Sequence, residues 1–194
     1  MIAALVPVKR LAEAKSRLAP RLSSEERTAL VREMLDRTVW ALRESRAVDR
    51  VALATPEPDL AGSLGVELVA DTGDLNGSLR WAAGWAEAGG AQGLLIVPAD
   101  LPSITPEAIR SLIESSGDGP GLAVARTQDG GTGALLLMPP SLIPPAFGPD
   151  SFQRHLSLAA RLRVPIHQIT SGPLCFDLDT AEDLEAFQGM KRFV

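Results

Sequence analysis

The sequence predicts one α/β domain over residues 1–194, built on a mixed sheet with helices on both faces. Short apolar runs typical of buried strands alternate with longer segments whose apolar residues recur at helical spacing. The length of 194 residues fits a single domain. The runs Leu122–Arg126 and Ala134–Pro139 are joined by a glycine-rich turn, which predicts an antiparallel hairpin in an otherwise parallel sheet.

The first predicted strand, Ile2–Val8, runs into a loop rich in cations. Lys9, Lys15 and Arg17 belong to this loop. Many α/β proteins hold phosphates in the loop that follows the first strand. The loop has no glycine, so neither common glycine-rich phosphate-binding fingerprint is present. A basic loop in contact with solvent is the plain alternative.

A long amphipathic helix is expected next, over Ser24–Ser45. Ser23 and Glu26 have the spacing of a capping box, in which each side chain accepts a hydrogen bond from the other residue's backbone N–H. Two short strands, Val51–Thr55 and Val66–Ala70, follow, with connectors rich in proline and glycine.

The loop Asp71–Ser78 lies beyond the third strand and leads into another helix. Asn76 or Ser78 is expected to cap this helix. Trp81 and Trp85 are four residues apart on it, which favours a packing stripe over base stacking.

One carboxylate stands at the end of a buried strand. Leu94–Val97 is apolar throughout, as in strands covered on both faces, and Pro98 lacks the N–H that a central strand needs. Asp100 therefore lies just past the carboxyl end of a strand, where open α/β sheets hold ligands. The alternative is that Asp100 only caps a turn. Thr105 and Pro106 predict the start of the next helix.

Prolines interrupt regular structure from the end of the hairpin to Phe147. Asp150 or Ser151 is then expected to cap a helix that runs to about Arg163, so that free backbone N–H groups at its start could meet an anion. A late strand is expected at Pro165–Thr170.

The segment Leu174–Thr180 is expected to be an extended last strand. Its alternation places Asp177 and Asp179 on one side. The plain alternatives are a turn-stabilising role for Asp177 and an ion pair for Asp179. Thr180 and Asp183 predict the cap of a final helix.

The composition excludes several classes of protein. The formal net charge is −5, so a nucleic-acid partner on a general basic surface is not expected. A single cysteine, Cys175, excludes an internal disulfide and a thiolate zinc cluster. No apolar segment reaches the ~18 residues of a membrane span, and the apolar N-terminal run is too short for a signal peptide. A cytoplasmic protein without membrane contact is expected.

Three features are expected to converge at the ligand edge of the sheet. They are the cationic loop, Asp100, and the pair Asp177 and Asp179. Carboxylate oxygens suit Mg²⁺, which bridges to phosphates. Cations and a metal around one site are typical of phosphoryl or nucleotidyl transfer.

Neutral donors for an anion stand elsewhere in the chain. Thr132 lies in the glycine-rich turn, and Gly148 and Ser151 lie at a helix start. His155 and His167 have no serine or cysteine partner at a recognisable spacing, so acyl transfer has little support.

Several short motifs occur together in a fixed order. They are VPVK and AKSRL within Val6–Leu18, LN at Leu75-Asn76, PADLP at Pro98–Pro102, GGT-x-ALLL at Gly130–Leu137, FGP-x-SF-x-RH at Phe147–His155 and DLDT-x-EDL at Asp177–Leu184. Over essentially its full length, the chain resembles the guanylyltransferases of deazaflavin coenzyme (F420) biosynthesis. That family joins GMP from GTP to 2-phospho-L-lactate or, in its bacterial branch, to phosphoenolpyruvate.

The resemblance implies a three-layer, Rossmann-like fold of the nucleotide-diphospho-sugar-transferase type and dependence on Mg²⁺. By motif position, the resemblance assigns the phosphorylated acid to Thr132, Gly148 and Ser151, and the metal to Asp100, Asp177 and Asp179. It assigns catalysis to Asp100 and Lys15. The residues that it assigns to the nucleotide are Pro7, Val8, Lys9, Lys15, Arg17 and Asn76. Gly133 departs from the asparagine that the family often has after GGT, which removes one polar side chain near the acid.

The expected reaction is therefore transfer of GMP from GTP to phosphoenolpyruvate with release of pyrophosphate. Phosphoenolpyruvate is chosen because the chain is rich in arginine and alanine and poor in lysine, a composition that resembles bacterial proteins. The same reaction on 2-phospho-L-lactate or 3-phosphoglycerate stays open. A non-catalytic nucleotide-binding module is a rival of another class, and the D-x-D pattern of Asp177 and Asp179 also suits a sugar nucleotidyltransferase or a glycosyltransferase. The sequence leaves open whether the chain forms a homodimer.

Overall fold

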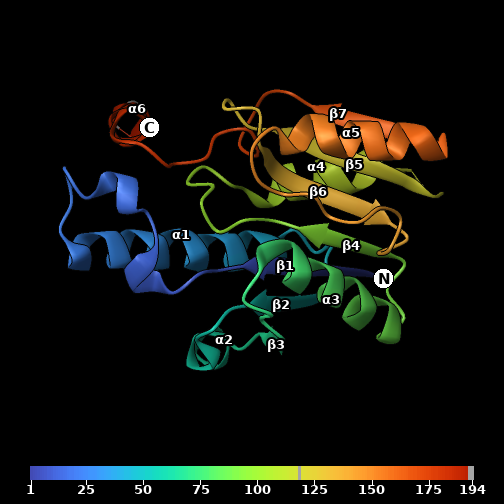
Figure 1. Cartoon of the computed structure of the whole chain (residues 1–194), viewed down its shortest axis with the longest axis horizontal. Helices are drawn as coiled ribbons and strands as arrows, with labels where there is room; N and C mark the ends of the chain where they lie inside the picture. Colours follow the sequence, from blue (N-terminus) through green and yellow to red (C-terminus); the bar gives the residue numbers. More distant parts are fainter. Residues whose placement is uncertain (118, 192–194) are drawn as a thin grey trace.

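The computed structural model describes residues 1–117 and 119–191. Their strands form one seven-stranded sheet in the order β3-β2-β1-β4-β6-β5-β7 (Figure 1). The strands are β1 (Ile2–Pro7), β2 (Arg50–Ala54), β3 (Glu67–Val69), β4 (Gly93–Ile96), β5 (Gly121–Arg126), β6 (Thr132–Met138) and β7 (Ile166–Ile169). Within the described residues, β6 alone runs antiparallel to both of its neighbours, β4 and β5. The predicted mixed sheet and its antiparallel hairpin are confirmed.

Helices cover both faces of this sheet, which gives the predicted three layers. The helices are α1 (Ser24–Glu44), α2 (Pro58–Leu64), α3 (Leu75–Ala88), α4 (Pro106–Ser115), α5 (Ser151–Leu162) and α6 (Ala181–Lys191). Buried apolar residues of α2, α4 and the later part of α1 share one cluster, and those of α3 and α5 share another. In Figure 1, α6 lies beyond the edge of the sheet, near the start of α1. No described helix is both long and apolar enough to cross a membrane.

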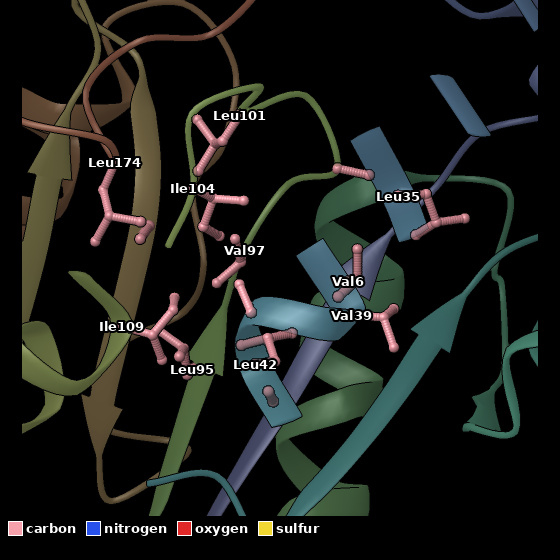
Figure 2. Packing of buried hydrophobic residues seen from close by; sticks show 14 of the residues in the cluster. Val6, Leu35, Val39, Leu42, Leu95, Val97, Leu101, Ile104, Ile109 and Leu174 are labelled. Carbon is pink, nitrogen blue, oxygen red and sulfur yellow. The ribbon is translucent and has the colours of Figure 1, made fainter. Parts of the chain in front are cut away.

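The core explains why these strands are apolar without a break. In β1, Ala4 and Val6 belong to the cluster under α1, whereas Ala3 and Leu5 belong to the cluster on the other face. Figure 2 shows the first cluster, where Val6 and Leu95 of the sheet lie near Leu35, Val39 and Leu42 of α1 and Ile109 of α4. Burying each large apolar side chain contributes about 1.5–3 kcal/mol. Packing on both faces holds the strands in place, so that their ends form a fixed edge of the sheet.

Helix α2 was missed by the sequence analysis, which placed only connectors between the second and third strands. It is a short helix with Pro58 in its first turn. Gly65 ends it in the left-handed conformation, with φ 62°. These are ordinary start and stop signals, but so short a segment carries little apolar periodicity.

Most of the predicted helix caps are confirmed. The capping box of Ser23 and Glu26 forms, Thr105 accepts a hydrogen bond from the N–H of Ala108, and Asp183 accepts one from the N–H of Thr180. The prediction for α3 was wrong. Its cap is Asp74, which accepts a hydrogen bond from the N–H of Gly77 at 2.7 Å, because the helix begins earlier than expected.

Two predictions near the C-terminal end were also wrong. Asp150 precedes α5 in the left-handed conformation, and its side chain makes no capping hydrogen bond. Ser151 is the first helical residue and not the cap. The segment Leu174–Thr180 is irregular and pairs with no strand. A backbone hydrogen bond from Leu178 N–H to the carbonyl of Asp100, at 3.0 Å, holds it instead.

Candidate functional site

A cleft of about 740 Å³ opens where β1, β2 and β4 end. Parallel strands bring their carboxyl ends to the same edge, so residues far apart in sequence meet there. Of the predicted site residues, Pro7, Val8, Lys9, Lys15, Arg17, Asp100 and Asp179 line this cleft. The cationic loop and two of the three predicted metal ligands therefore share one cavity, as expected.

Lys15 lies at the centre of the charged groups in this cleft. Its backbone has the left-handed conformation, with φ 54° and ψ 39°, which few residues other than glycine adopt. Its Nζ lies 3.1 Å from Asp100 Oδ2 and 2.5 Å from Asp179 Oδ1, and only 8% of the side chain is exposed. Burial alone would lower the pKa of this amine, but Asp100 and Asp179 raise it above its ordinary value. Lys15 is therefore a charged bridge between two carboxylates.

The three predicted metal ligands come from two segments that touch. The hydrogen bond between Leu178 N–H and the carbonyl of Asp100 brings the segments together, and Asp177 and Asp179 flank Leu178. Burial, together with the nearby charges of Asp100 and Asp129, raises the pKa of Asp177 to about 6. Negative charge is thus concentrated at this point of the edge.

The chemistry of these carboxylates suits a hard divalent cation. Carboxylate oxygens are the ligands that Mg²⁺ prefers, and a cation would relieve the repulsion that raises the pKa of Asp177. In the part of the chain that the structure describes, however, no three acidic, histidine or cysteine side chains already converge closely enough to hold a metal. Lys15 supplies the positive charge at two of the three carboxylates. The assignment of Asp100, Asp177 and Asp179 to a metal stays a prediction.

The residues predicted to bind the acid also come together. Because β6 runs antiparallel to β4, its first residues lie beside the end of β4, and Leu135 pairs with Ile96. Thr132 Oγ1 lies 2.9 Å from Ser151 Oγ. The N–H of Ser151 donates to the carbonyl of Gly148, whose φ of 121° suits glycine. Thr132 and Ser151 are buried, whereas Gly148 is exposed. None of the three lines the cleft, although the neighbouring Phe147 does.

Asn76 does not line the cleft, although it was predicted to bind the nucleotide. Its Nδ2 donates to the carbonyl of Phe147 at 3.0 Å, and its Oδ1 accepts from the N–H of Phe147 at 2.8 Å. Both ends of the amide are therefore engaged with one backbone unit. In this structure Asn76 positions the segment that leads to Gly148.

Asp71, Ser78 and Phe147 also line the cleft, although the sequence analysis assigned none of them to the site. Asp71 follows the end of β3, so the argument that singled out Asp100 would also have found it. Ser78 was considered only as a cap. It donates instead to Asp71 Oδ1 at 3.1 Å.

Gly133, the departure from the family pattern, lies against the acidic segment. A Cβ at this position would stand 2.0 Å from the carbonyl oxygen of Leu174. We therefore expect Gly133→Ala to displace the segment that carries Asp177 and to lower the free energy of unfolding by about 2 kcal/mol. Chemical denaturation measures this change. Gly62→Ala is the control, since a Cβ there meets nothing within 4 Å, and equal stability of the two variants would contradict the close approach.

His155 is the other buried polar group beside Thr132. It is fully buried. Burial, and to a lesser degree the charge of Arg154, lowers its pKa from 6.5 to about 4. Between pH 6.5 and pH 4, His155 is therefore protonated in the unfolded chain but stays neutral in the folded state. Stability from this histidine is complete above pH 6.5 and is lost as the pH falls toward 4.

This loss amounts to about 3 kcal/mol in the free energy of unfolding between pH 6.5 and pH 4. Denaturant titrations at several pH values measure it. The decline should be smaller in His155→Asn, which cannot titrate. A decline of the same size in both proteins would show that other groups cause it.

Comparisons with known proteins show the family of the chain. A family model described as guanylyl transferase CofC like matches residues 2–188. The phosphoenolpyruvate guanylyltransferase of Sphaerobacter thermophilus is 42% identical, over 96% of this chain and 92% of that protein. The 2-phospho-L-lactate guanylyltransferase of Methanothermobacter thermautotrophicus is 34% identical, over 93% of this chain and 81% of that protein.

The fold has a counterpart among solved structures. A crystal structure of a nucleotide-diphospho-sugar transferase from Desulfovibrio desulfuricans G20 superposes with a TM-score of 0.85 at 19% identity. The match covers 98% of this chain and 87% of that one. At this identity the likeness establishes the fold, and it confirms the expected type.

Proposed function

The chain belongs to the guanylyl transferase CofC like family, and from this we propose that it transfers GMP from GTP to phosphoenolpyruvate in the biosynthesis of coenzyme F420. The observation that carries the proposal is the bridge from Lys15 to Asp100 and Asp179 in a cleft at the strand ends. Here a buried cation and a group of carboxylates lie together, as a reaction between two polyanions requires. We place the reaction in the cytoplasm.

In the proposed reaction, a phosphate oxygen of phosphoenolpyruvate attacks the α-phosphorus of GTP. A new P–O bond forms there, the bond from the α-phosphorus to the α,β-bridging oxygen breaks, and pyrophosphate leaves with that electron pair. The second pKa of a phosphate monoester is about 6, so the attacking group is already largely ionised at neutral pH. No general base is needed, which agrees with a cleft that has no histidine among the described residues of its lining.

The chain's own residues would lower the repulsion between the two substrates. The Lys15 ammonium, together with Lys9 and Arg17 of the same loop, would face the nucleotide phosphates. Thr132, Gly148 and Ser151 would form the site for the phosphorylated acid. Asp100, Asp177 and Asp179 would hold Mg²⁺, which when bound supplies positive charge to the phosphates.

The acceptor is tested by a panel. GTP and Mg²⁺ are incubated with phosphoenolpyruvate, 2-phospho-L-lactate, 3-phosphoglycerate or a sugar 1-phosphate, and pyrophosphate release is measured. We expect the highest kcat/KM with phosphoenolpyruvate. A higher kcat/KM with 2-phospho-L-lactate would contradict this choice of acceptor and favour the activity named for the Methanothermobacter relative. Pyrophosphate release only with a sugar phosphate would refute the proposal in favour of a sugar nucleotidyltransferase. No release with any acceptor would refute it in favour of a binding module.

A further inference from the structure

A continuous chain of hydrogen bonds runs through the buried group beside the cleft. The N–H of Ala146 donates to His155 Nε2 at 3.0 Å. His155 Nδ1 lies 3.1 Å from Thr132 Oγ1, which lies 2.9 Å from Ser151 Oγ. The side chains come from α5 and β6, and His155 and Ser151 are 0% and 1% exposed. Water therefore has almost no access to disturb the order of the donors.

The first link fixes the direction of the bond between His155 and Thr132. A backbone N–H can only donate, so His155 Nε2 accepts and carries no proton. The neutral imidazole must then hold its proton on Nδ1 and donate it to Thr132. Since Thr132 Oγ1 accepts from the imidazole, its own hydroxyl proton is free to go to Ser151.

The chain ends on a hydroxyl whose proton is not used. When Thr132 donates its proton to Ser151 Oγ, the described part of the protein offers the Ser151 O–H no other hydrogen-bond partner. A serine hydroxyl can present either a proton or a lone pair to a ligand, and an anion accepts only the proton. If Thr132 donates to Ser151, the Ser151 proton is available to an anion. If Ser151 donates to Thr132, only a lone pair of Ser151 faces the ligand, and it repels an anion.

We propose that His155 is a positioning residue that fixes this direction, so that Ser151 meets the phosphorylated acid as a hydrogen-bond donor. The inference rests on the proposed function, because it takes the phosphorylated acid as the ligand of Ser151. His155 acts through Thr132 and does not touch the acid itself. Burial supports this role, because it keeps the imidazole neutral at the pH where the enzyme works.

His155 also has a structural role, and the test must separate the two. Its ring lies edge-on to Phe147 with the centroids 5.2 Å apart, and its Nε2 holds the backbone of Ala146. Two substitutions separate the roles of the two imidazole nitrogens. In His155→Asn the side-chain amide can replace the donor at Nδ1, whereas in His155→Gln the longer side chain can replace the acceptor at Nε2. A purely structural role favours glutamine, and the proposed role favours asparagine.

The experiment measures KM for phosphoenolpyruvate and for GTP in both variants, after denaturation has shown that each is folded. We expect His155→Gln to raise KM for the acid roughly tenfold, the effect of one lost hydrogen bond to a charged group, and His155→Asn to raise it less than about threefold. KM for GTP should be unchanged in both. His167→Gln, at an exposed position of β7, is the control for a histidine substitution as such.

Thr132 gives a second, independent pair. Thr132→Val keeps the shape but removes the hydroxyl link, so it should raise KM for the acid as His155→Gln does, and Thr132→Ser should restore it. Equal acid KM values for His155→Asn and His155→Gln, or an equal rise in KM for GTP, would overturn the inference. Failure of the wild-type protein to use any phosphorylated acid would instead refute the proposed function, so the two failures are distinguishable.

Discussion

Asp100→Asn is expected to lower kcat for pyrophosphate release at least roughly a thousandfold while the protein remains folded. The change keeps the shape of the side chain and removes its charge. The free energy of unfolding should fall by no more than about 1 kcal/mol, because Lys15 keeps Asp179 as a charged partner and Leu178 bonds to the backbone carbonyl of Asp100. Steady-state kinetics and a denaturant titration measure the two effects separately.

A matched control uses the same chemical change on the surface. Asp36 pairs with Arg32 one helical turn away on α1, and half of its side chain is exposed. Such pairs contribute only a few tenths of a kcal/mol. Asp36→Asn should therefore keep full activity. If Asp100→Asn also turned over at a near-normal rate, Asp100 could not be a metal ligand.

Lys15→Met is expected to lower kcat/KM roughly a hundredfold or more, because the ammonium that bridges the carboxylates would no longer meet the phosphates. The substitution keeps most of the side-chain length. It leaves Asp100 and Asp179 without their shared partner, which should also lower the free energy of unfolding by about 1–2 kcal/mol. The loss stays modest because both carboxylates are partly exposed to water.

The same variant tests where Mg²⁺ binds, without any measurement of activity. With the ammonium gone, the carboxylates face one another uncompensated, so Mg²⁺ alone should raise the Tm of Lys15→Met more than that of the wild type. Arg161→Met, which removes an exposed cation on α5, serves as the control. The same Mg²⁺-induced rise in all three proteins would exclude Asp100 and Asp179 as the binding site.

The place of Asp100 could be predicted because its causes are local. An apolar run followed by Pro98 ends a buried strand, and the carboxylate after it must reach the ligand edge of the sheet. The hairpin of β5 and β6 was predictable for the same reason, since its turn residues and both strands are neighbours in sequence.

Contacts that depend on the assembled fold could not be predicted. The resemblance singled out Lys15 in the cationic loop, but its contact with Asp179, across most of the length of the chain, depends on the assembled fold. Asn76 was assigned by motif, but its two hydrogen bonds to Phe147 exist only once α3 and the segment before α5 lie side by side. The direction of hydrogen bonding through His155 likewise requires the position of one backbone N–H.

The most direct test of the account is the identity of the products formed from GTP and phosphoenolpyruvate. In ³¹P NMR of a reaction with Mg²⁺, we expect pyrophosphate and a new phosphoanhydride between GMP and the acid to appear in equal amounts. Attack at the β- or γ-phosphorus would give other products, such as GDP. Formation of GDP or inorganic phosphate without the phosphoanhydride would contradict transfer of GMP at this site.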